Sequence, residues 1–448
     1  MEPFRLGLLD VLRAFREGSL SVPDYIASLA GRIVAREADL RAWEWFDPSR
    51  AMAEAEERAG GILQDLPLYG IPVGVKDIIA TRGIPTRMGS PIFSGHVPTQ
   101  SAWVVRRLEA LGGLVMGKTV TTEFAYRLAG KTRNPWNTAH TPGGSSSGSA
   151  AGVAAGYVPA AIGTQTLGSV IRPAAFCGVV GYKPSFGAIS RTGILPFSGT
   201  LDTVGVFARG VADAAWFGAC LMGQETRDEA TVVRGAMHTL SVPLTALPGP
   251  PRLAVVRTHK WPMATEAQRH NFDESVATLK DAGAAVREVP LPRAFESAWE
   301  NVMLIMSREA VKNFATIESR HRIRLSPALV TLLDRGRRVT PEEYARAREK
   351  REEYRLWLDR LFDGCEAIVT VPASGEAPAG LSDTGDATFC SLWTQAGLPA
   401  VTIPSGFGPR GLPLGFQVVG RYREDERALQ VAAWCENVLG FQPGLAGD

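Results

Sequence analysis

Short apolar runs that alternate with longer helical stretches constrain the fold of this chain most strongly. From residue 66 onward, the runs "GIPVGVKDII" and "GLVMGKT" are bounded by glycine and proline, and the helical stretch "SAWVVRRLEALGG" lies between them. This alternation is typical of chains in which helices cover a buried sheet. We therefore predict an α/β fold whose sheet is largely buried.

Helices dominate the residues before this region. Ser21 followed by Asp24 is a capping signal, Pro23 suits a first helical turn, and apolar residues recur at helical spacing through Val34. We expect the helices of residues 4–60 to cover the sheet.

The rest of the chain divides into a small-residue segment, a charged segment and a second run of strands. "SGSAAGVAAG", residues 147–156, predicts a closely packed helix, and "YVPAAIGT" after it predicts a strand. Residues 220–360 are more charged, and we interpret them as a variable helical lobe and not as the chemical centre. Its helices are expected near 264–282, 294–318 and 341–362. The stretch from Glu366 to Ala373, "LPAVTIPSG" and "LPLGFQVVG" predict further strands.

Composition and charge argue against several classes of protein. Hydrophobic residues make up 45% and charged residues 21% of the 448 positions, as in ordinary globular proteins. The net charge is +2 with no long run of Lys and Arg, which argues against a nucleic-acid partner. No uncharged apolar run reaches the roughly 18 to 20 residues that span a bilayer. Because "MEPFRLGLLDVLRAF" also lacks the pattern of a signal peptide, we expect no membrane association and, by default, a cytoplasmic protein.

The cysteines and histidines do not have the spacing of a disulfide frame or a metal site. The five cysteines are scattered and never spaced as CxxC, which predicts reduced thiols. The six histidines include no HExxH motif. We expect neither a metal nor another cofactor.

The segment "GGLVMGKT", Gly112 to Thr119, satisfies the phosphate-loop pattern GxxxxGK[ST]. Taken alone, it suggests nucleotide binding through Lys118 and Thr119. A phosphate loop follows a strand and opens a helix. Here a helix precedes the motif, and Gly113 to Met116 have the pattern of the strand itself. We interpret the segment as a buried strand.

The run "PGGSSSGSAAG", residues 142–152, places three successive hydroxyls before a predicted helix. A linker, an anion cradle, a tight turn and nucleophilic chemistry are all open for this composition, although the neighbouring segments leave little room for a free linker. A reactive serine also needs a base. The candidates are His140, five residues before Ser145, and Lys76 at the end of the apolar run "GIPVGV".

Lys76 and a second serine carry the other chemical signals. To act as a base near neutral pH, Lys76 needs a pKa lowered from about 10.4 to roughly 7 or 8, which requires a dry, hydrogen-bonded site. Ser169 in "GTQTLGSVIRPAAFCG" follows a glycine after an apolar strand, where successive N–H groups can point at one oxyanion. A surface lysine and a helix-capping serine are the structural alternatives.

Several motifs in one order and spacing together resemble the amidase signature hydrolases. They are "GIPVGVKD", "GKTVTTEFA", "NPWNTAHTPGGSSSGSAAGVAAG", "GTQTLGSVIRPAAFCGVVGYKPSFG" and "LDTVG", and "GLPAVTIPSG" and "GLPLGFQVVG" resemble the closing strands of that family. The resemblance implies an α/β fold with a mixed sheet covered by helices on both sides. It implies one domain over residues 1–448, with an N-terminal helical region at 1–65, the signature core at 66–210 and the variable lobe at 220–360.

The resemblance also implies a Ser-Ser-Lys triad. On the matching positions Ser169 is the nucleophile, Ser145 the bridging hydroxyl and Lys76 the ultimate base. The oxyanion would be held by the backbone N–H groups around Thr166, Leu167, Gly168 and Ser169.

The chain departs from the family at two positions. Leu167 stands where the family usually has glycine, and it would be strained if the backbone required positive φ; otherwise it narrows the acyl pocket or fills core. Gln165 stands where many members have aspartate. Arg172 follows Ser169 by three residues, as in the malonamidase-like branch, where an arginine receives the substrate carboxylate. A structural arginine paired with a buried acid or a helix end is equally open.

These residues predict an amidohydrolase acting on linear amides. It would hydrolyse the C–N bond of a small carboxamide through a seryl acyl-enzyme and release ammonia or an amine. Its partner would be a small-molecule amide, and a homodimer is left open. One alternative is the glutaminase subunit of a tRNA-dependent amidotransferase, which requires partner subunits. Another is a non-catalytic binding relative, suggested by Leu167.

Overall fold

The computed structural model describes residues 2–59, 65–231 and 240–447, and a single mixed sheet lies at its centre. The strands are β1 (Trp43–Phe46), β2 (Pro72–Lys76), β3 (Leu114–Thr119), β4 (Ala160–Gln165), β5 (Val180–Lys183), β6 (Thr203–Ala208), β7 (Arg252–Val255), β8 (Ala285–Glu288), β9 (Ala367–Thr370), β10 (Ala400–Phe407) and β11 (Pro413–Val419). Within the described residues these eleven strands follow the order β1-β3-β2-β4-β6-β5-β10-β11-β9-β7-β8. β2 is parallel to β3 and β4, whereas β4, β6, β5, β10 and β11 pair antiparallel in turn.

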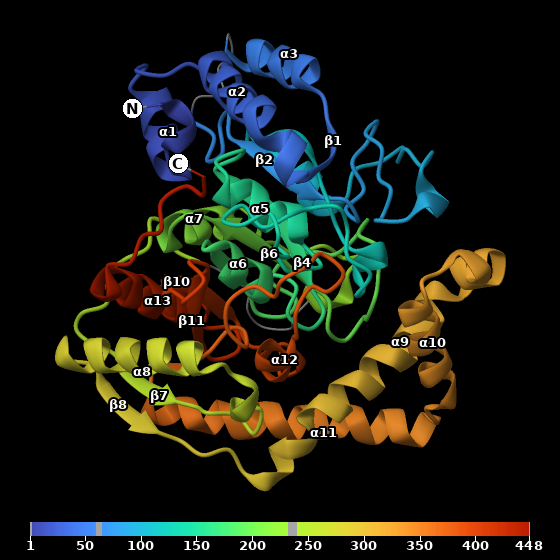
Figure 1. Cartoon of the computed structure of the whole chain (residues 1–448), viewed down its shortest axis with the longest axis vertical. Coiled ribbons are helices and arrows are strands. Elements are labelled where there is room, and N and C mark those ends of the chain that lie inside the picture. The colour runs from blue at the N-terminus through green and yellow to red at the C-terminus, as the bar shows by residue number, and fades with distance from the viewer. Residues whose placement is uncertain (1, 60–64, 232–239, 448) are drawn as a thin grey trace.

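Helices surround this sheet (Figure 1). They are α1 (Leu8–Arg16), α2 (Val22–Leu40), α3 (Pro48–Ala59), α4 (Trp103–Ala110), α5 (Ser147–Ala154), α6 (Ile171–Cys177), α7 (Val211–Leu221), α8 (Glu266–Asp281), α9 (Ala298–His321), α10 (Pro327–Arg338), α11 (Pro341–Leu361), α12 (Thr388–Gln395) and α13 (Asp425–Leu439). In Figure 1 the blue helices α1 to α3 lie at one end of the molecule, and α9 to α11 lie at the other.

Two neighbouring residues of β5 show that helices cover both faces of the sheet. Successive strand residues point to opposite faces. A Cβ built on Gly181 would lie 2.6 Å from Ala174 in α6, whereas the ring of Tyr182 lies against Gly218 in α7. α6 and α7 therefore pack on opposite faces, and the predicted α/β architecture is confirmed.

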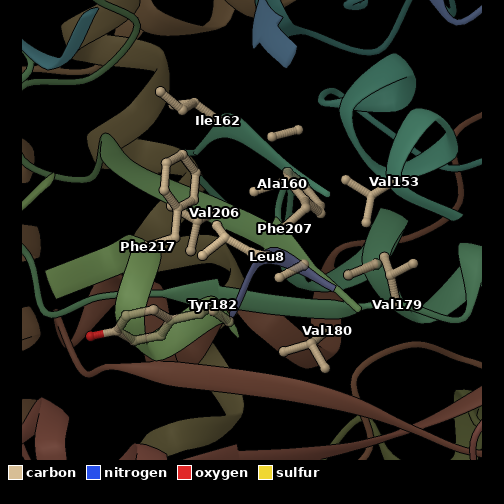
Figure 2. Packing of buried hydrophobic residues seen from close by; sticks show 14 of the residues in the cluster. Leu8, Val153, Ala160, Ile162, Val179, Val180, Tyr182, Val206, Phe207 and Phe217 are labelled. Atoms are coloured by element: carbon tan, nitrogen blue, oxygen red, sulfur yellow. The ribbon is translucent and has the colours of Figure 1, made fainter. Parts of the chain in front are cut away.

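Side chains from distant segments meet in the core. Figure 2 shows Leu8 of α1, Val153 of α5 and Phe217 of α7 together with Tyr182 and Phe207 of the central strands. These side chains are all fully buried. The N-terminal helical region thus packs on the same core as the strands.

Most of the predicted elements form where the sequence places them. The predicted small-residue helix is α5, and the phosphate-loop pattern lies in β3. The Ser21 hydroxyl accepts a hydrogen bond from the Asp24 N–H at 3.2 Å, as its capping signal predicts.

The expectation of helices alone was wrong in two regions. The strand β1 interrupts the predicted helices of residues 4–60, and β7 and β8 lie within the predicted helical lobe of residues 220–360. These two strands lie at one edge of the sheet, and β8 is mostly exposed, so its residues "AVRE" carry no buried-strand pattern. No helix in the described ranges is both long and apolar enough to cross a membrane.

Candidate active site

Lys76 ends β2 and lies fully buried in the middle of the molecule. Its Nζ lies 2.7 Å from Ser145 Oγ and 2.8 Å from Thr164 Oγ1, and it donates a longer bond of 3.4 Å to the Thr164 carbonyl. Burial lowers the pKa of Lys76 well below its usual value; nearby Asp202 opposes this and Arg172 adds to it. The site therefore favours a neutral amine, which can accept a proton.

The three successive serines have different partners. Ser145 contacts Lys76, whereas the Ser146 hydroxyl donates to the Thr164 carbonyl at 3.3 Å. The Ser147 hydroxyl donates to the Gly143 carbonyl at 2.7 Å. The sequence run therefore supplies one serine to the lysine and uses the other two to hold its own backbone.

The two other candidates from the sequence, His140 and Lys118, have structural contacts. His140 Nδ1 lies 2.8 Å from the Ala377 carbonyl oxygen. Lys118 is buried and forms a 3.2 Å ion pair with Asp77, and it also donates to the Ile79 carbonyl at 2.9 Å. The motif "GGLVMGKT" therefore does not form an exposed phosphate loop, as the strand interpretation predicts.

Ser169 lies in the loop Thr166–Ser169 that joins β4 to α6, and Gln165 organises this loop. The Gln165 Oε1 accepts the N–H groups of Val170 at 2.8 Å and Ile171 at 3.0 Å. Its Nε2 donates to Thr394 Oγ1 at 2.8 Å. A neutral amide thus fixes the start of α6 in this chain, and both of its polar atoms are used.

Leu167 fits the loop without backbone strain, because its φ angle is not positive. Its side chain is partly buried against the apolar cluster that includes Phe197 and Met306. The next residue must be small: a Cβ on Gly168 would lie 3.1 Å from the Cβ of Cys390. Within the described part of the chain, no acceptor takes the N–H groups of Leu167, Gly168 or Ser169.

A cavity of about 480 Å³ opens beside these residues, and Ser145 and Ser169 both line it. Its wall also includes Leu167 and Arg172. Other lining residues come from the predicted lobe and from the loop before α12: Trp299, Met306, Pro327, Ala328, Asp383 and Asp386. The predicted lobe therefore contributes to the wall of the cavity, whereas Lys76, Ser145 and Ser169 lie outside the lobe.

Arg172 is buried at the floor of this cavity. Its Nη2 donates to the Gly144 carbonyl at 2.6 Å and to Thr384 Oγ1 at 3.3 Å. Its buried Nε has no hydrogen-bond partner among the described residues, and no carboxylate in that part of the chain forms an ion pair with it. Burial lowers the pKa of Arg172, and Asp386 and Asp383 oppose this shift. A structural pair with a buried acid is thus not present in the described residues, whereas the bond to the Gly144 carbonyl is a structural contact close to the start of α5.

Sequence reasoning missed two residues of the site. Thr164 contacts Lys76 directly, and Asp202 accepts a 2.6 Å hydrogen bond from the Thr166 hydroxyl. Both residues lie in motifs that carry the resemblance, "GTQT" and "LDTVG", which is the only signal that could have found them. No group of three or more His, Cys, Asp or Glu side chains in the described ranges is arranged to hold a metal ion.

Comparisons with known proteins identify a family over most of the chain. Residues 24–429 match the amidase family. A glutamyl-tRNA(Gln) amidotransferase subunit of Roseiflexus sp. is 34% identical over 95% of both chains, and the corresponding amidotransferase subunit of Lysinibacillus sphaericus is 30% identical over 98% of both.

Solved structures are similar over nearly the whole chain. A protein from a vestigial complex related to the origins of an s-triazine catabolic enzyme has a TM-score of 0.88 at 27% identity, covering 98% of this chain and 99% of that one. A protein described as an amidase has a TM-score of 0.85 at 29% identity, covering 96% and 99%. The glutamyl-tRNA(Gln) amidotransferase subunit of Thermotoga maritima has a TM-score of 0.81 at 28% identity, covering 98% and 96%.

The family match, the mixed sheet and the shared order of motifs point to the same conclusion. The chain is an enzyme that acts on amides, and it belongs to the amidase family.

Proposed function

We propose that this enzyme hydrolyses a small carboxamide through a Ser-Ser-Lys relay and a seryl acyl-enzyme. The observation that carries this proposal is the 2.7 Å contact between Lys76 Nζ and Ser145 Oγ in a fully buried setting. A buried neutral lysine bonded to a hydroxyl is an effective base.

Each proposed step uses groups that line or adjoin the cavity. Ser169 Oγ attacks the amide carbonyl and gives its proton to Ser145, whose own proton passes to Lys76. The tetrahedral oxyanion is held by backbone N–H groups around Thr166 to Ser169. The proton returns along the same route to the leaving nitrogen as the C–N bond breaks, and water then hydrolyses the ester on Ser169.

The substrate proposed for this site is a small amide that carries a carboxylate. Arg172 is a buried cation that lines the cavity, and no carboxylate in the described residues forms an ion pair with it. A guanidinium binds a carboxylate through charge-assisted hydrogen bonds. Exposed Arg127 at the same cavity adds a second positive charge.

Ser169→Ala tests the reaction. We expect ammonia release from small amides to fall by more than about a thousandfold and labelling by a fluorophosphonate to vanish. Ser147→Ala is the matched control, because Ser147 bonds to the Gly143 carbonyl, and the label should stay on Ser169. Turnover that survives in Ser169→Ala, or a label on another serine, would overturn the assignment.

A second candidate is the glutaminase subunit of a tRNA-dependent amidotransferase. The names of the curated relatives favour this role over a stand-alone enzyme. The cavity also suits glutamine, since Asp383 and Asp386 accompany Arg172 there and a free amino acid carries both charges. Ammonia release from glutamine that requires added partner subunits, together with a native mass that grows on mixing, would favour this role. Full activity of the purified chain toward small acidic amides would favour the stand-alone enzyme.

A further inference from the structure

We infer that Asp202 is a positioning residue that anchors the nucleophile loop through Thr166 and supplies the negative charge that balances Lys76 when Lys76 holds a proton. This inference rests on the proposed function, because it takes Lys76 as the base. Asp202 belongs to the motif "LDTVG", to which the proposed triad assigns no role.

The Asp202 carboxylate is held by three donors from two segments. Its Oδ1 accepts the Thr166 hydroxyl at 2.6 Å, and its Oδ2 accepts the N–H groups of Phe197 at 2.7 Å and Ser198 at 2.8 Å. Burial raises the pKa of Asp202, and these three donors act against that shift because they stabilise the charged form. Thr166 begins the loop that carries Ser169, and Phe197 lines the substrate cavity. The carboxylate therefore ties the nucleophile loop to the cavity wall.

Asp202 is also the acidic group whose charge favours the protonated form of Lys76. The pKa of Lys76 is lowered chiefly by burial and further by Arg172, and Asp202 acts against both. The other buried charges near the end of β2, Asp77 and Lys118, pair with each other at 3.2 Å. A base that takes up a proton inside the protein is stabilised by such an opposite charge.

The surroundings of Asp202 leave its charge available to the site. Its cationic neighbour Arg191 is bound by both carboxylate oxygens of Asp228, at 2.7 Å and 3.0 Å. Asp202 itself is only partly buried, and it lines a second cavity of about 200 Å³ together with Thr164 and Thr166. Thr164 accepts a hydrogen bond from Lys76 and lines the same cavity, so this residue connects the lysine to the cavity that Asp202 lines.

Two variants separate the two parts of this inference. Asp202→Asn removes the charge, and Thr166→Val removes one hydrogen bond but keeps the charge. The acid limb of the pH profile of kcat/KM marks the deprotonation of Lys76. Without the nearby negative charge, the protonated lysine is less stable, so in Asp202→Asn the limb should move to lower pH by about one unit and kcat should fall. In Thr166→Val, kcat should fall about tenfold while the limb stays in place.

The outcomes are decisive for each part. An unmoved acid limb in Asp202→Asn overturns the charge role, and full kcat in Thr166→Val overturns the anchoring role. If Asp202→Asn does not fold, Asp202→Glu replaces it: the charge is kept but displaced, so the limb should stay and kcat should fall, and a wild-type kcat contradicts the inference. The Ser169→Ala experiment tests the proposed function independently of these two variants. If Ser169→Ala keeps its activity, the proposed reaction is wrong; if only the predictions for Asp202→Asn and Thr166→Val fail, the inference about Asp202 alone is wrong.

Discussion

Leu167 lies in the loop between β4 and α6, at a position where the sequence resemblance predicts a glycine. Its backbone is unstrained, so its side chain acts through the volume it fills beside the cavity. Leu167→Gly should therefore raise kcat/KM for bulky acyl groups about tenfold relative to the smallest substrate, since pocket methylenes are worth about 1–3 kcal/mol. The measurement is the ratio of kcat/KM for two amides of different acyl size. Leu167→Met, which conserves volume, should leave that ratio unchanged, and an equal ratio in Leu167→Gly would contradict the prediction.

Arg172 sets a second prediction at this scale. Arg172→Met should lower kcat/KM for acidic amides about 10- to 100-fold more than for neutral amides of equal size, because one charge-assisted hydrogen bond contributes about 1.5–3 kcal/mol. The ratio matters because Arg172 also holds the Gly144 carbonyl, so both substrates lose some rate. Arg127→Met is the control: an exposed cation should change only a salt-dependent attraction. Equal losses for both substrates in Arg172→Met would refute carboxylate recognition.

The residues of the site were predictable to different degrees. Lys76, Ser145 and Ser169 carry chemistry that stands out in a glycine-rich or apolar context, and the family resemblance orders them. Thr164 and Asp202 do not stand out, because threonine is common in strands and aspartate is common in turns. Their contacts join residues that are far apart in the chain, such as Lys76 and Thr164. The periodicity of apolar residues along the sequence does not indicate which distant residues meet.

At the scale of elements, α5 shows why the glycines and alanines of "SSSGSAAGVAAG" matter. Every residue of this helix is buried, and a Cβ on Gly148 would collide with the Ala42 carbonyl oxygen and lie 2.5 Å from the Val120 nitrogen. Gly148→Ala should therefore destabilise the protein by about 1–3 kcal/mol, as overpacking does. Gly152→Ala is the matched control in the same helix, since its new Cβ would meet only Tyr157 at 3.9 Å.

Denaturant unfolding of both variants gives the answer. Gly152→Ala should be neutral or stabilising by up to about 1 kcal/mol, because alanine favours the helix over glycine. Equal stability of the two variants would show that the close approach of Gly148 to the backbone of Ala42 and Val120 does not limit residue size.

Two of the strands that sequence reasoning missed, β1 and β8, share a physical cause. β1 has only four residues, three of them half-buried, and β8 is mostly exposed. Edge strands of this kind lack the continuous apolar run that marks a strand buried on both faces. The buried strands β2, β3 and β4 carry such runs and were predicted, whereas β5 and β6 are equally buried and were not predicted.

At the scale of the whole molecule, the substrate cavity lies where the signature core meets the helices that follow it. The core supplies Lys76, Ser145 and Ser169, and residues of α9 and of the start of α10 complete the wall. Sequence motifs indicate where the proposed chemistry takes place, because only a few residue types can perform it. The wall residues that α9 supplies, Trp299 and Met306, are apolar and could occur in any helix, so the sequence alone indicates the reaction better than the substrate.

Buried lysines should also give the stability of the whole protein a distinct dependence on pH. Burial lowers the pKa of Lys183 to about 7, opposed by Asp425, and its Nζ donates to the Pro184 carbonyl at 2.8 Å. Between about pH 7 and 10.4 the unfolded lysine is protonated and the folded one is largely neutral, so the unfolded state binds more protons and stability rises with pH. Below pH 7 both states are protonated and this dependence ends.

Lys183→Met removes that contribution while filling the same space. The gain in unfolding free energy between pH 7 and pH 9 should be about 2 kcal/mol smaller in this variant than in the wild type. Chemical denaturation of both proteins at the two pH values measures the difference, and other titrating groups cancel in the comparison. Lys183 is buried and donates to one carbonyl, so we expect it to lose its proton in the folded state. An identical gain in unfolding free energy in both proteins would mean that folded Lys183 keeps its proton, and it would contradict the prediction.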